Sequence, residues 1–129
     1  MASHVADLCA EHGITIVERA SYGGWASKKS RTICIKPVKT QRTYIVALHE
    51  IGHIVGSGRS GTRLEQEAAA WRFVLDRSAV ALAPATYARM QRYLESYLWK
   101  AERSRRLSVP DAGSQFWSTY ARIREGASS

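Results

Sequence analysis

The sequence predicts an α+β fold, in which a small sheet of about three strands packs on a central helix and a helical part follows. Three observations support this prediction. Short β-prone runs lie ahead of residue 40, a strongly apolar helical pattern spans 40–55, and helical patterns follow from residue 63. The chain of 129 residues has the length of one domain, with 1–83 as its core and 84–129 as C-terminal helices.

The first forty residues alternate short elements with turn signals. We expect a short helix at residues 3–12 that ends at Gly13. Strands are expected at 14–19, 25–28 and 31–36. In the last of these strands, alternation places Ile33 and Ile35 on one face.

The helix expected at residues 40–55 carries three polar residues in an apolar setting. His49 and His53 are four residues apart and therefore share one face, and Glu50 lies about 100 degrees from His49 around the axis. The opposite side is apolar, which is typical of a central, buried helix. Burying three polar groups without partners is costly, and a metal ion would supply a partner.

Three further helices are expected in the second half. Thr62 fits an N-cap, and Glu65 completes a capping box for a helix from residue 63 to about 80. Pro84 suits the first turn of a helix that runs to about 105, and a last helix carries aromatic residues around Phe116. The glycine-rich turn at 56–61 lacks a phosphate-loop pattern, and the methionine and aromatic stripes are typical of core packing.

The segment His49-Glu50-Ile51-Gly52-His53 reads H-E-x-x-H, the core of a zinc-peptidase site. Catalytic zinc usually takes three protein ligands, so two histidines are not enough. The metzincin pattern would place a third histidine six residues after His53, where this chain has Arg59, and a permanent cation cannot bind zinc.

A glutamate from the following helix is the remaining source of a third ligand. Glu67 lies in the middle of the apolar face, beside Trp71, whereas Glu65 points with charged residues and already serves as a cap. Glu67 is therefore the favoured third ligand, with Glu65 as the alternative.

The order of elements and motifs resembles compact gluzincins of the ImmA/IrrE type over roughly residues 1–85. Those proteins have a strand shortly before the H-E-x-x-H helix and a helix with E-x-E-A-N-x-F-A after it. The matching run here is Glu65-Gln66-Glu67-Ala68-Ala69-Ala70-Trp71, with Ala69 in place of the usual Asn. The resemblance implies zinc held by His49, His53 and Glu67, with Glu50 as catalytic base. It also implies a protein substrate, such as a transcriptional regulator.

We therefore expect a zinc-dependent endopeptidase, in which zinc lowers the pKa of a water molecule and Glu50 takes its proton during attack on a peptide carbonyl. An extended peptide would add as a strand to a sheet edge, expected at 23–28. A second donor for the oxyanion is also needed. The sequence leaves five candidates open for it: Tyr22, Tyr87, Tyr93, His12 and Arg59.

The net charge of +8 and the pI of about 9.9 suggest affinity for polyanions, although solvated cationic faces are common. The alternative function is a non-catalytic, zinc-stabilised module that binds a protein or nucleic acid through a basic helical face. That face would comprise Arg89, Arg92, Lys100, Arg103, Arg105 and Arg106.

The first residues show no basic or apolar leader pattern, and Cys9 and Cys34 form no C-x-x-C motif. We therefore expect a cytoplasmic location, no membrane partner and two reduced thiols.

Overall fold

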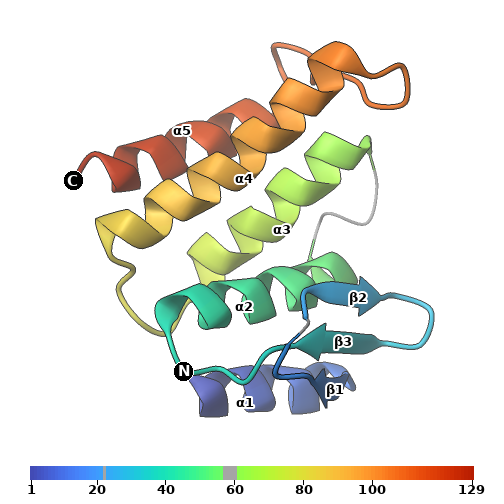
Figure 1. Cartoon of the computed structure of the whole chain (residues 1–129), viewed down its shortest axis with the longest axis vertical. Coiled ribbons are helices and arrows are strands. Elements are labelled where there is room, and N and C mark those ends of the chain that lie inside the picture. Colours follow the sequence, from blue (N-terminus) through green and yellow to red (C-terminus); the bar gives the residue numbers. More distant parts are fainter. Residues whose placement is uncertain (22, 57–60) are drawn as a thin grey trace.

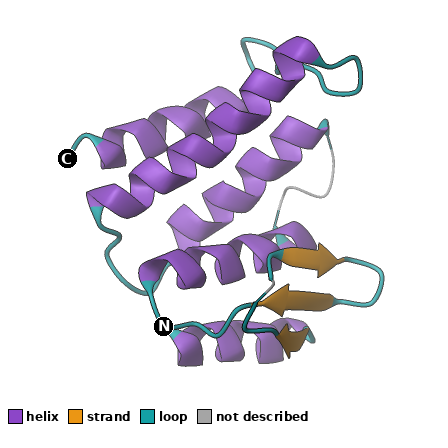
Figure 2. Cartoon of the chain, viewed as in Figure 1, coloured by secondary structure: helices purple, strands orange, loops and turns teal. Residues whose placement is uncertain are grey.

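The computed structural model describes residues 1–21, 23–56 and 61–129. Within these ranges the chain forms three strands and five helices in the expected order, so the predicted α+β fold with a helical C-terminal part is confirmed (Figures 1 and 2). The elements are α1 (Ala2–His12), β1 (Thr15–Glu18), β2 (Trp25–Ser27), β3 (Thr32–Ile35), α2 (Gln41–Val55), α3 (Arg63–Arg77), α4 (Pro84–Arg103) and α5 (Gln115–Ala127).

The sheet has the strand order β1-β3-β2, with β1 parallel and β2 antiparallel to β3. β2 is therefore an edge strand, as expected for this segment. Gly23 and Gly24 bring the chain into β2. A Cβ at Gly23 would meet the Lys36 backbone nitrogen at 2.7 Å, and Gly24 has a φ of 97°, so both positions favour glycine. These glycines hold the edge strand close to the end of β3.

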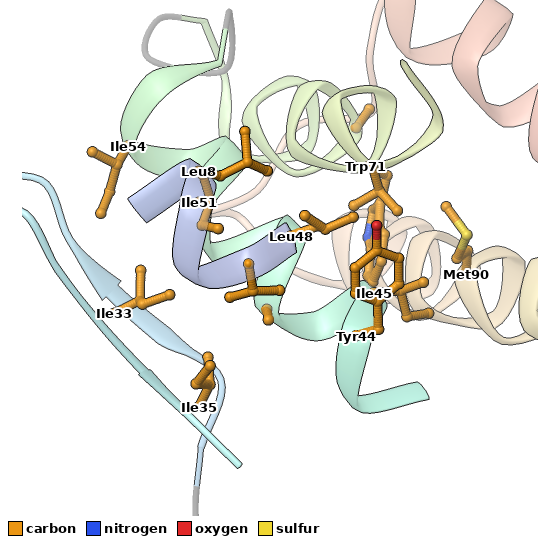
Figure 3. Packing of buried hydrophobic residues seen from close by; sticks show 14 of the residues in the cluster. Leu8, Ile33, Ile35, Tyr44, Ile45, Leu48, Ile51, Ile54, Trp71 and Met90 are labelled. Carbon is orange, nitrogen blue, oxygen red and sulfur yellow. The ribbon is translucent and has the colours of Figure 1, made fainter. Parts of the chain in front are cut away.

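Helix α2 forms the centre of the molecule. It packs against α1, β2 and β3 on one side and against α3 on the other, and α3 in turn packs against α4 and α5 (Figure 1). Ile33 and Ile35 of β3 point toward the helices, where Ile51, Ile54 and other apolar residues of α2 are buried (Figure 3). The apolar pattern of 40–55 predicted this central position correctly.

Small residues let α2 and α3 approach closely. A Cβ added at Gly52 would lie 3.0 Å from the carbonyl oxygen of Ala70 and 3.0 Å from the Cβ of Phe73. Ala68, Ala69 and Ala70 are buried on the facing helix. Because the two helices cross so closely, side chains of α3 can reach the polar residues of α2.

The helix ends follow local chemistry. Both α2 and α3 begin with capping boxes, formed by Thr40 with Thr43 and by Thr62 with Glu65. Helix α3 ends at Arg77 instead of about residue 80, because the chain turns at Ser78 and the Ala79 amide donates to the Tyr44 hydroxyl instead of continuing the helix.

Among the described residues, none of the helices is both long and apolar enough to cross a membrane.

Candidate metal centre

Helix α2 places His49, Glu50 and His53 beside one another. His49 and Glu50 are buried, with 7% and 5% of their surface exposed, and His53 is half-buried. The two imidazole Nε2 atoms lie 3.1 Å apart, because residues four apart stack on one face of the helix. The motif therefore has the geometry that the sequence predicted.

Glu67 of α3 completes this group. One carboxylate oxygen lies 3.2 Å from His49 Nε2, and the other lies 2.7 Å from His53 Nε2. In a tetrahedral zinc site with bonds of about 2.0–2.1 Å, ligand atoms are separated by about 3.3 Å. The three side chains thus converge on one point with nearly the spacing that a single zinc ion requires, and the donor set of two imidazoles and one carboxylate suits that metal.

The protonation states also fit a metal. Burial lowers the pKa of His49, which favours the neutral imidazole. Burial alone would raise the pKa of Glu67, but hydrogen bonds from His49 and His53 outweigh it and hold this pKa well below its usual range. A neutral imidazole and an ionised carboxylate are the forms that bind metal ions.

Glu50 has a different environment from Glu67. Burial raises the pKa of Glu50 to about 7, against the opposing charges of His53 and Arg63. Its Oε2 is buried and has no hydrogen-bond partner among the described residues. A carboxyl group with a pKa near neutrality and a free oxygen has the properties of a general base.

Ligand-type atoms of His49, Glu50 and His53 also lie within 4.8 Å of one another, so Glu50 is a second geometric choice for the third ligand. Glu67 fits better for two reasons. Its two oxygens contact both histidines directly, and its low pKa keeps it an anion, whereas Glu50 carries a proton up to about pH 7.

Glu65, the alternative from the sequence, serves elsewhere. It accepts hydrogen bonds from the Thr62 backbone and side chain, and its other oxygen accepts from Ser114 at 2.7 Å. These contacts cap α3 and tie its start to the start of α5. Glu65 is therefore positioned as a structural cap, away from the two histidines.

Aromatic side chains form one wall of the centre. The ring of Trp71 lies against His49, with centroids 3.9 Å apart, and Tyr93 of α4 stacks on Trp71 at 5.3 Å. This stack fixes the His49 ring and extends the site to the C-terminal helices. The site thus draws on α4, beyond the segment 1–83 assigned to the core.

The centre lies in a cleft of about 740 Å³. Residues 23–29, including the edge strand β2, line one side, and α2, α3 and α4 supply the remainder, with Val46, His49, Glu50, His53, Arg63, Gln66, Glu67, Trp71, Tyr93 and Tyr97. An unpaired strand edge beside the centre can receive an extended chain.

Tyr97 and Arg63 were missed as site residues, because the aromatic stripe that includes Tyr97 was interpreted as core packing. The two side chains interact with each other, and Tyr97 also interacts with Glu67. Burial and the charge of Glu67 raise the pKa of Tyr97, so its hydroxyl stays protonated. Helical spacing could have found Arg63, because it lies four residues before Glu67 on the same helix, whereas the position of Tyr97 depends on how α4 packs.

The five residues that the sequence offered as the second oxyanion donor lie in different parts of the molecule or outside the described residues. Tyr93 lines the cleft, whereas Tyr22 and Arg59 lie outside the described residues. Tyr87 packs against Gly126 at the end of α5, and His12 ends α1, so neither lines the cleft.

The proposed basic face lies apart from the cleft. Arg92, Lys100, Arg105 and Arg106 are exposed, and none of the six residues lines the cleft. Arg103 stacks over Trp99 and also bonds its carbonyl, so this side chain is engaged within its own helix.

No protein-family model, curated protein or solved structure matches this chain.

Proposed function

We propose that this protein is a zinc-dependent endopeptidase that hydrolyses a peptide bond in a specific protein partner, such as a transcriptional regulator. One observation carries the proposal. His49, His53 and Glu67 converge from two helices on one point, and Glu50 lies beside them, buried and with a free oxygen. The resemblance to compact gluzincins of the ImmA/IrrE type agrees with these roles.

The residues of the centre have different roles. His49, His53 and Glu67 would hold the metal, and zinc in that position supplies Lewis-acid chemistry that activates water and polarises a carbonyl. Glu50 accepts the proton of the attacking water at its free Oε2 and donates it to the departing amine. The pKa of about 7 suits both transfers near neutral pH.

The substrate would enter as an extended strand. β2 is paired with β3 on one edge only within the described residues, and residues 23–29 line the cleft. A peptide that pairs with β2 would place its backbone against the metal centre, and main-chain hydrogen bonds would supply affinity without demanding particular side chains.

Tyr97 is the second donor that the geometry favours. It lines the cleft, interacts with Glu67 and keeps its proton at neutral pH. Arg63 lines the same cleft and interacts with the Tyr97 side chain, which would help to position it. A protonated hydroxyl beside the centre can donate to a developing oxyanion.

The chemistry of the thiols fits a reducing compartment. Cys9 and Cys34 are both buried and unpaired. We therefore place this peptidase in the cytoplasm, where thiols stay reduced.

The test compares wild type with Glu50→Gln after loading with zinc. Both proteins are incubated with a peptide library derived from a whole proteome, and new termini are identified by mass spectrometry. We expect cleavage by the wild type and a loss of about 10²–10⁴-fold in the variant, with zinc content unchanged.

The matched control is Glu11→Gln, which removes an exposed carboxylate from α1 and should leave cleavage unaltered. Equal cleavage by wild type and Glu50→Gln would refute the role of Glu50. Bound zinc with no cleavage of any peptide would favour the non-catalytic module instead.

A further inference from the structure

We infer that the cleft selects acidic peptides: the preferred substrate segment carries aspartate or glutamate on both sides of the bond to be cut. This inference rests on the proposed peptidase function and names the substrate class of the same site. It follows from cations that flank the cleft at both ends of β2.

Lys28 and Lys29 occupy the first end. They follow β2 directly, line the main cleft and are exposed. Neither forms an ion pair with a carboxylate within the described part of the chain. Two neighbouring ammonium groups with no acidic partner are available to a ligand in the cleft.

Lys36 and Arg42 occupy the second end. They line a smaller hollow of about 150 Å³ that shares Gly23, Val46 and Tyr93 with the main cleft, so the two hollows adjoin. Both cations are exposed, and neither has an ion-pair partner in residues 1–21, 23–56 and 61–129.

The carboxyl groups of the cleft are buried at its centre, away from its exposed rim. The two among the described lining residues are Glu50 and Glu67. Glu67 is engaged by both histidines, and 5% of the surface of Glu50 is exposed. Arg63 contributes one more cation on the α3 side. The exposed rim is therefore cationic, and charge complementarity favours an acidic partner.

The strand β2 (Trp25–Ser27) lies between the two cationic ends. Lys28 follows the strand directly, and Gly23, two residues before it, packs on the Lys36 backbone. A peptide that pairs with β2 would therefore run from one cationic end to the other, with acidic side chains on both sides of the paired segment.

A peptide explains these features better than a nucleic acid. The unpaired edge of β2 offers amide and carbonyl groups in the pattern that a peptide backbone pairs with, and a sugar-phosphate chain does not. The cations lie at the ends of that edge instead of along a continuous face.

The experiment has a cleavage arm and a binding arm. In the first, zinc-loaded wild type is given peptides of equal length that differ only in whether flanking positions hold glutamate, glutamine or lysine, and kcat/KM is measured. In the second, zinc-loaded Glu50→Gln binds the same fluorescent peptides and a DNA duplex, so binding is measured without turnover.

Lys28→Glu/Lys29→Glu is the test variant, and Arg105→Glu/Arg106→Glu is the matched control, with the same charge change outside the cleft. We expect the glutamate peptides to be preferred about tenfold or more. That preference should be lost in the test variant, kept in the control and weakened by salt, because each exposed contact is modest and screened.

The outcomes separate the two proposals. Cleavage of all peptides without regard to charge would overturn the acidic preference and leave the peptidase function in place. Preferential binding of acidic peptides with no cleavage of any peptide would support the preference and overturn the peptidase function. If the DNA duplex bound more tightly than the acidic peptides and displaced them from the cleft, the acidic-peptide inference would be overturned.

Discussion

Glu50 is predicted to destabilise the metal-free protein at neutral and alkaline pH. Its carboxyl group has a pKa of about 7 in the folded chain, against an ordinary value of 4.5, because burial disfavours its charge. Below pH 4.5 both folded and unfolded chains hold the proton. As the pH rises from 4.5 to about 7, the unfolded chain loses the proton first, so the free energy of unfolding falls.

The separation between 4.5 and about 7 corresponds to about 3 kcal/mol, at about 1.4 kcal/mol per pH unit. Replacing Glu50 with glutamine removes the ionisable group and keeps its shape. In the presence of a chelator, Glu50→Gln should therefore unfold at a higher urea concentration than the wild type at pH 8. The gain in the free energy of unfolding of Glu50→Gln over the wild type should be about 2–3 kcal/mol larger at pH 8 than at pH 5.

The assay is urea denaturation followed by circular dichroism at both pH values. Glu11→Gln, which removes an exposed carboxyl group, controls for the loss of a negative charge. A stability difference between wild type and Glu50→Gln that is the same at pH 5 and pH 8 would refute the reasoning, since it would mean that Glu50 ionises freely in the folded chain.

Three further predictions concern neighbouring parts of the structure. Gly52→Ala should lower the free energy of unfolding by about 1–2 kcal/mol and weaken zinc binding, because the new methyl presses on Ala70 and moves α3; urea denaturation and zinc titration would detect both effects. Burial raises the pKa of the Cys9 thiol to about 11, so it should react with a disulfide reagent only after unfolding. Tyr97→Phe should lower kcat about 10²-fold with zinc content unchanged, whereas Tyr93→Phe should have little effect; equal losses in both variants would contradict the donor role of Tyr97.

Much of the fold could be predicted because local signals and burial agreed. Gly13 ends α1 in the left-handed conformation, Thr62 and Glu65 form the expected capping box, and Pro84 lies in the first turn of α4. The same agreement distinguished the two glutamates of α3. Glu67 lies on the apolar face of the helix, whereas Glu65 is engaged as a cap.

The sequence did not reveal how the C-terminal helices join the cleft. Tyr97 follows the apolar period of α4 and therefore looked like a core residue. Whether such a residue faces a core or a cleft depends on the packing of α4 against α3, which no local pattern encodes. For the same reason, the cationic ends of the cleft are visible only after folding, which places Lys28 and Lys29 at one end of β2 and Lys36 and Arg42 at the other.

Metal content tests the central claim most directly. Wild type, Glu67→Ala and Glu65→Ala are purified, supplied with zinc, dialysed and measured by elemental analysis, with circular dichroism to confirm that each is folded. We predict about one zinc per chain in the wild type and in Glu65→Ala, and little in Glu67→Ala, because Glu67, unlike Glu65, contacts both histidines. A wild type that holds no zinc, or a Glu67→Ala variant that holds as much as the wild type, would contradict the account.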